Sequence, residues 1–157
     1  MAKVYLETTI PSYLASYRSH DLVVAAHQQI THDWWRDAKN RFDLFVSEAV
    51  LEEIRAGDPE AASRRLQVVA GLPVLELSEN VRELVRVYDQ HLGLPSRARA
   101  DLPHFAFAVS YKMDYLLTWN CSHIANGEVI RRLMNVNFSL NLFMPLIITP
   151  EEILENL

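Results

Sequence analysis

The sequence contains a single cysteine, Cys121, among its 157 residues. An internal disulfide is therefore excluded, and this cysteine usage suits a reducing cytosol. Long apolar runs are also missing, because no segment approaches the roughly 18 residues needed to span a membrane. The opening residues lack the apolar core of a signal peptide. We therefore expect a cytoplasmic protein with no membrane partner.

No repeat, low-complexity tract or linker rich in Pro, Gly and Ser interrupts the chain, so the sequence offers no domain boundary. Hydrophobic residues make up 50% of the sequence and charged residues 22%, which is typical of a folded protein. The length is sufficient for one well-packed core. We expect one domain over residues 1–157.

An excess of positive charge is absent as well, since the formal net charge is −5. No overall basic field therefore indicates a nucleic-acid partner. Local patches and bound metal ions can still invert the potential at a site. The net charge thus weakens a nucleic-acid function without excluding it.

Short apolar segments alternate with helical patterns along the whole chain. The helical patterns include an amphipathic repeat over residues 79–93 and an apolar face over residues 102–113. Such alternation predicts an α/β fold with a parallel sheet covered by helices on both faces. The expected helices cover residues 8–14, 21–40, 48–57, 58–72, 79–93, 102–113, 124–134 and 150–157. The expected strands cover residues 3–7, 42–47, 73–77, 114–119 and 145–149.

Ligands of such folds bind outside the carboxyl ends of the strands. Glu7 ends the first expected strand and Asn120 follows the fourth. Asp101 opens the helix before the fourth strand, where it could serve as a plain N-cap. On the helix after the second strand, Glu48 and Glu53 both flank the apolar stripe, and helical geometry alone does not choose between them.

Carboxylates gathered at one place repel each other unless a positive charge is present. Mg²⁺ and Mn²⁺ prefer such oxygen ligands, with waters completing the octahedron. A metal held in this way can activate a water against a phosphodiester and stabilise the charge of the transition state. Phosphodiester hydrolysis is therefore the reaction that this set of residues indicates. The alternative for each acid is an ordinary exposed strand-end or helix residue.

Three segments resemble the PIN domain, the nuclease fold that includes the VapC-type toxins. They are YLETTIPSYL at residues 5–14, VSEAVLEEIRAG at 46–57 and ADLPHFAFAVSYKMDYLLTWNCSHI at 100–124. The third is the most specific, because its acid, helix, strand and T-x-N stand at family-like spacing. The resemblance covers nearly the whole chain. It implies a three-layer αβα sandwich whose sheet of about five parallel strands has the order 3-2-1-4-5.

The resemblance implies catalytic and metal-binding roles for four residues, namely Glu7, Glu53, Asp101 and Asn120. It selects Glu53 over Glu48 because Gly57 stands four positions after the acid. Two hydroxyls, those of Thr8 and Thr118, would support the acids or the attacking water. His123 would be a phosphate contact or proton carrier, or else a surface or helix-cap residue.

The implied activity is that of a Mg²⁺- or Mn²⁺-dependent endoribonuclease, the toxin of a toxin–antitoxin pair with a small antitoxin protein as its partner. Two departures from the family pattern support an alternative. The family usually has Asp where this chain has Glu7, and often has Asp where it has Asn120. The alternative is an impaired PIN-like domain that binds RNA or protein. A third reading is a metal-dependent phosphohydrolase of small phosphate esters, which a closed small pocket would favour.

Arginines and tryptophans supply the remaining candidates for contacts with partners. Arg97 and Arg99 stand just before Asp101, where they could hold RNA phosphates. Trp34 and Trp35 lie together in a helical segment, where they could stack on RNA bases, although such a pair more often belongs to the core or to the interface of a homodimer. We expect RNA, an antitoxin and a second copy of the chain as partners.

Overall fold

The protein is described by a computed structural model that covers residues 1–155. In this part of the chain five strands form one parallel sheet with the order β3-β2-β1-β4-β5. The expected α/β fold and strand order are thereby confirmed. The strands are β1 (Lys3–Leu6), β2 (Asp43–Ser47), β3 (Val74–Leu75), β4 (Tyr115–Leu117) and β5 (Leu146–Ile148).

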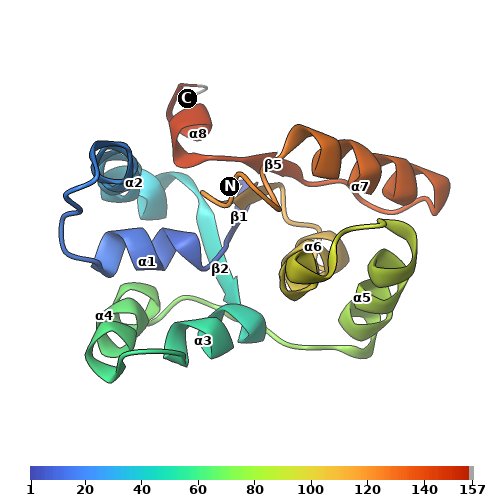
Figure 1. Ribbon diagram of the computed structural model, residues 1–157, viewed down its shortest axis with the longest axis horizontal. Coiled ribbons are helices and arrows are strands. Elements are labelled where there is room, and N and C mark those ends of the chain that lie inside the picture. The colour runs from blue at the N-terminus through green and yellow to red at the C-terminus, as the bar shows by residue number, and fades with distance from the viewer. Residues whose placement is uncertain (156–157) are drawn as a thin grey trace.

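Helices cover both faces of the sheet. On one face lie α1, α2 and α4, and on the other lie α5, α6 and α7 (Figure 1). The helix α3 follows directly from the carboxyl end of β2. The helices are α1 (Thr9–Ala15), α2 (Leu22–Arg41), α3 (Glu48–Arg55), α4 (Pro59–Val69), α5 (Glu79–His91), the 3₁₀ helix η1 (Ser96–Asp101), α6 (Leu102–Ser110), α7 (Gly127–Ser139) and α8 (Pro150–Glu155). The expected last helix runs to residue 157, and its final two residues lie outside the described part.

The central strands and α6 form the core. Val4, Tyr5 and Leu6 of β1 are completely buried, as expected for the middle strand of a sheet covered on both faces. Most of α6 is also buried, with Phe105 and Phe107 among the largest side chains of the interior. The burial of α6 on nearly all sides explains why its sequence is apolar almost throughout.

Several element boundaries differ from the sequence expectation for local reasons. The helix α6 ends at Ser110 instead of residue 113, because Lys112 adopts a left-handed conformation with φ of 53°. The helix α7 begins at Gly127 rather than residue 124, since Asn126 caps it through the backbone N–H groups of Glu128 and Val129. The helix η1 was not expected at all.

The tryptophan pair divides between two environments. Trp34 is 2% exposed and packs against the ring of Phe42, so it belongs to the core. Trp35 is half-buried and carries the ammonium of Lys39 over its ring at 5.4 Å. The core alternative therefore holds for Trp34, and the homodimer stays a prediction.

A buried hydrogen bond joins two helices of one layer and offers a test of stability. The hydroxyl of Tyr88 on α5 donates to Asn137 Oδ1 on α7 at 2.7 Å. Replacing Tyr88 by phenylalanine removes the donor and leaves the buried amide oxygen without it. We expect the free energy of unfolding in urea to fall by about 1–3 kcal/mol.

Tyr17 provides the control for this substitution, because its side chain is 74% exposed. Tyr17→Phe is expected to change the free energy of unfolding by less than about 0.5 kcal/mol. If Tyr88→Phe were as stable as Tyr17→Phe, the α5–α7 hydrogen bond would have no net role in stability.

Candidate functional site

The carboxyl edge of the sheet collects the candidate residues from segments far apart in sequence. Glu7 follows β1, and Glu53 lies on the helix that follows β2. Asp101 ends η1 just before α6, and Asn120 stands three residues after β4. Since β1 lies between β2 and β4, the strand order places these segments around one centre.

Glu7 is a buried carboxylate held by hydroxyl and backbone donors. Its side chain is 3% exposed. Its Oε1 accepts from the Thr118 hydroxyl at 2.7 Å, the Thr9 hydroxyl at 2.5 Å and the Thr9 backbone N–H at 3.1 Å. The Thr9 hydroxyl also accepts from the backbone N–H of Trp119 at 2.9 Å. Glu7 is therefore not a solvated strand-end residue but a fixed link between β1 and the segment after β4.

Glu53 is oriented by two side chains from other elements. Its Oε1 accepts from the Thr8 hydroxyl at 2.8 Å and lies 2.6 Å from Nε2 of His104. The other candidate on this helix, Glu48, accepts instead from the backbone N–H of Leu77 beside β3. The structure thus brings Glu53, and not Glu48, to the carboxyl edge of the central strands.

Asp101 stands at the N-terminus of α6 without capping it. Its side chain makes no cap hydrogen bond, because η1 runs directly into the helix. Instead, Oδ2 lies 3.2 Å from Nδ1 of His123. The N-cap explanation of this residue is therefore wrong, and its carboxylate is directed to the loop that follows β4.

Asn120 organises that loop. Its Oδ1 accepts from the backbone N–H of His123 at 3.0 Å, and its carbonyl accepts from Ile124 and Ala125. Its own N–H donates to the Thr118 hydroxyl at 2.9 Å. The side-chain oxygen of Asn120 therefore already has a structural partner, and it could bind a metal only through its remaining lone pair.

The two arginines of η1, Arg97 and Arg99, differ in whether their side chains are already paired with an acid. Nε of Arg99 lies 3.0 Å from Asp89 Oδ1. Arg97 is exposed and, within residues 1–155, its side chain takes part in no hydrogen bond or ion pair. Arg97 is therefore the freer of the two cations near Asp101.

The charges at this edge influence one another. Desolvation by burial would lower the pKa of His104, but the surrounding carboxylates of Glu53, Glu7 and Asp101 raise it above its usual value. Partial burial acts to raise the pKa of Glu53, yet His104 and Thr8 outweigh it and the net pKa is lowered. Burial raises the pKa of Asp101 despite the opposing effects of His104 and His123. All three acids are thus close enough to His104 to interact with it electrostatically.

Sequence reasoning missed two residues of this cluster, Thr9 and His104. Thr9 immediately follows Thr8, so a second hydroxyl beside the acid was the available signal. His104 is a basic residue within the apolar helix α6, one turn after Asp101. A polar side chain on an otherwise buried face requires a partner, and that requirement could have indicated it.

The carboxylate oxygens at this edge are suitable ligands for a hydrated hard cation. Each acid uses only one oxygen in its contacts with the described residues, which leaves Glu7 Oε2, Glu53 Oε2 and Asp101 Oδ1. In the part of the chain described, no three His, Cys, Asp or Glu side chains form a ready-made cage for an ion. Mg²⁺ does not require such a cage, because it usually keeps several waters and binds one or two carboxylates. The residues therefore fit a partly hydrated Mg²⁺ or Mn²⁺.

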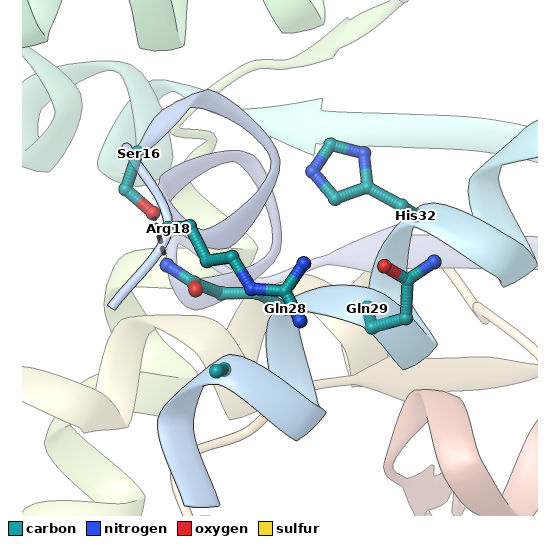
Figure 2. A pocket seen from close by; sticks show the side chains of 6 residues that line it. Ser16, Arg18, Gln28, Gln29 and His32 are labelled. Atoms are coloured by element: carbon teal, nitrogen blue, oxygen red, sulfur yellow. Dashed lines mark hydrogen bonds between the residues drawn. The ribbon is translucent and has the colours of Figure 1, made fainter. Parts of the chain in front are cut away.

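A pocket at the α1–α2 corner lies apart from the candidate acids. It has a volume of about 200 Å³ and is lined by Ser16, Arg18, Ala25, Gln28, Gln29 and His32 (Figure 2). Gln28 donates to the Ser16 hydroxyl at 2.7 Å, which ties the loop after α1 to α2. The pocket is smaller than the roughly 300–1,000 Å³ of typical small-molecule sites. None of the candidate acids lines it, so this pocket provides no support for hydrolysis of small phosphate esters at the acids.

Comparisons of sequence return no relative, since no family model and no curated protein matches the chain. Among the helices described, none has the length and apolar character needed to cross a membrane.

Comparisons of structure, in contrast, find similar proteins. The chain resembles VapBC2 of Rickettsia felis, solved with a DNA fragment from its promoter, with 14% identity and a TM-score of 0.59 over 94% of this chain and 98% of that one. It resembles VapBC-1 of nontypeable Haemophilus influenzae with 14% identity and a TM-score of 0.59, over 95% and 98% of the two chains. It also resembles Mycobacterium tuberculosis VapC20, a toxin that cleaves the sarcin–ricin loop, with 14% identity and a TM-score of 0.58, over 79% and 95%. The strand order and these likenesses together show that the chain has the PIN-like fold of the VapC proteins.

Proposed function

We propose that this protein is a metal-dependent endoribonuclease and the toxin of a toxin–antitoxin pair. The observation that supports the proposal is the set of three acids, Glu7, Glu53 and Asp101, which the order of the strands brings to the carboxyl edge of the sheet from three separate segments. Each acid has an oxygen left for a cation or its water. The likeness to VapC structures adds support, because one of them is a toxin that cleaves the sarcin–ricin loop.

The roles of the residues follow from their contacts. Glu7, Glu53 and Asp101 would hold Mg²⁺ or Mn²⁺, with Asn120 as an auxiliary ligand. When bound, the ion would lower the pKa of a water and neutralise charge on the scissile phosphate. Thr118 and Thr9 hold Glu7 in a fixed position, so its free oxygen needs no reorganisation during the reaction.

The remaining candidates would act on the substrate. His123 faces Asp101 and is partly exposed, so it could move a proton or contact a phosphate at that side of the site. Arg97 is free to pair with an RNA phosphate, whereas Arg99 would first have to leave Asp89. Hydrolysis would proceed by direct attack of water, because among the described residues of this cluster no Ser or Cys lies in contact with a general base.

An antitoxin that covers this edge is part of the same proposal. Two of the similar structures are VapBC complexes. A partner that silences the enzyme would have to block the approach of RNA to the acids or displace the ion. Homodimer formation and residence in the cytoplasm stay predictions.

The decisive experiment is cleavage of a labelled single-stranded RNA by the purified protein. We expect cleavage with Mn²⁺ or Mg²⁺ and none with EDTA. Asp101→Asn is expected to lower the rate about 100-fold, comparable with the loss of one preorganised charge-stabilising group. Asp37→Asn, a change at an exposed carboxylate on α2, is the matched control and should cleave as the wild type does.

Two outcomes would contradict the nuclease. One is metal-independent cleavage equal in wild type and Asp101→Asn, which would indicate a contaminating ribonuclease. The other is an inert wild type with no detectable binding of Mn²⁺. That second result would favour the alternative of a PIN-like module that binds RNA or protein without cleaving it.

A further inference from the structure

His104 is a buried side chain that the proposed reaction does not use. It lies on α6, is completely inaccessible to solvent and follows Asp101 by one helical turn. Burying an imidazole among apolar side chains is unfavourable unless both ring nitrogens have partners. The identity of those partners therefore indicates what this histidine does.

A chain of hydroxyl groups reaches Nδ1 of the ring. Ser47 Oγ accepts from the backbone N–H of Val50 at 3.2 Å and lies 2.8 Å from the Tyr5 hydroxyl. The Tyr5 hydroxyl in turn lies 2.7 Å from His104 Nδ1. Burial raises the pKa of Tyr5, so its hydroxyl keeps the proton. When Ser47 donates to Tyr5 and Tyr5 donates to Nδ1, every group in the chain is satisfied.

This assignment places a hydrogen on the other ring nitrogen. A neutral imidazole that accepts at Nδ1 must carry its proton at Nε2, and a charged imidazole carries one there as well. Nε2 therefore presents an N–H in either state. It lies 2.6 Å from Glu53 Oε1, although the pair does not meet the angular geometry of a regular hydrogen bond.

The contacts of the Glu53 carboxylate with its neighbours are therefore all made by one oxygen, Oε1. The Thr8 hydroxyl, which belongs to the segment after β1, donates to the same Oε1 at 2.8 Å. The Thr8 hydroxyl and the adjacent Nε2 of His104 both lie against Oε1, which restricts the rotation of the carboxyl group and leaves Oε2 without a partner among the described residues.

We propose that His104 is a positioning residue, which holds the Glu53 carboxylate through Nε2 and is itself held by Tyr5, so that Oε2 of Glu53 is presented to the cation. The proposal rests on the proposed metal-dependent function. His104 is not a ligand in this arrangement, because both of its nitrogens have protein neighbours.

Binding of Mn²⁺, measured by calorimetry on the purified protein without RNA, tests this role. His104→Leu introduces an apolar side chain of similar bulk and removes both nitrogens. We expect the dissociation constant of Mn²⁺ to rise by about 10- to 100-fold, as for other residues that orient a metal ligand. His104→Gln keeps a side-chain amide that can donate to Glu53 and is expected to recover most of the affinity.

A control for general damage to the core is Tyr88→Phe, whose lost hydrogen bond lies between α5 and α7. It is expected to lower stability without changing Mn²⁺ affinity. If His104→Leu bound Mn²⁺ as tightly as the wild type, or if His104→Gln and His104→Leu were equally weak, the positioning role would be overturned.

A second readout needs no metal. Long-range ¹H–¹⁵N spectra of the metal-free protein report which ring nitrogen of His104 carries the proton. We expect the hydrogen at Nε2, with an Nε2 shift that changes in Glu53→Gln and stays constant in Glu52→Gln. A proton at Nδ1 alone, or an Nε2 shift indifferent to Glu53→Gln, would overturn the proposal.

The two readouts separate this inference from the proposed function. If the wild type bound no Mn²⁺ and cleaved no RNA, the proposed function would fail. The ring spectra would then decide alone whether His104 holds Glu53.

Discussion

Shortening Glu7 to aspartate is expected to lower the free energy of unfolding by about 3 kcal/mol, the scale of hydrogen bonds to a buried charge. Aspartate is the residue that PIN domains usually have here, yet this site is built around the longer side chain. The Thr9 and Thr118 hydroxyls both donate to Oε1 of Glu7. A carboxylate withdrawn by one C–C bond, about 1.5 Å, cannot reach both donors at once.

Glu7→Gln is the matched variant, because it keeps the length and an oxygen that can accept from the same threonines. Its free energy of unfolding should stay within about 1 kcal/mol of the wild type, since no buried hydrogen bond of Oε1 is lost. Urea unfolding of all three proteins in EDTA measures the difference without a contribution from bound metal. A Glu7→Asp protein as stable as the wild type would show that the threonine contacts do not select glutamate.

Replacing Glu53 by glutamine is expected to reduce the rate of metal-dependent RNA cleavage about 1,000-fold, the upper range for removal of one preorganised charge-stabilising group. His104 and Thr8 together lower the pKa of Glu53 against the effect of burial, so the wild-type side chain is ionised at neutral pH. The substitution therefore removes a full negative charge. The fold should be kept, because the side chain of Glu53 is 41% exposed.

Glu52→Gln supplies the control on the same helix. Glu52 is exposed and lies about 100° around α3 from Glu53, away from the cluster. Its cleavage rate should equal that of the wild type. If both variants lost activity to the same extent, damage to α3 would be the cause, and if Glu53→Gln cleaved normally, Glu53 would have no role in the reaction.

The α/β fold was predictable because its signals are local. Apolar segments such as residues 3–7 and 114–119 are too short for helices, and the segments between them repeat at helical spacing. The strand order came from the resemblance to PIN domains rather than from periodicity. Ends of elements were less predictable: β3 stops at Leu75 because the N–H of Leu77 donates to Glu48 instead of to the sheet.

In the candidate site, too, local sequence patterns predicted some features, whereas others depend on contacts with distant segments. Which glutamate of α3 meets the edge could not be read from helical spacing, since Glu48 and Glu53 flank the apolar stripe alike. The contacts that separate them come from Leu77 on one side and Thr8 and His104 on the other. Those partners are 29 to 51 residues away from them in sequence, and only packing brings them near.

By itself, the sequence determined the class of fold, the segments that reach the carboxyl edge of the sheet and the acidic chemistry gathered there. The tertiary structure decided which oxygens are held and which are left free. In the folded protein, Asp101 makes no cap hydrogen bond with α6, and the side-chain oxygen of Asn120 accepts from the backbone of its own loop. His104 lies between Tyr5 and Glu53. The physical reason is that hydrogen bonds of buried polar groups depend on partners from distant segments, whereas apolar periodicity is a property of each segment alone.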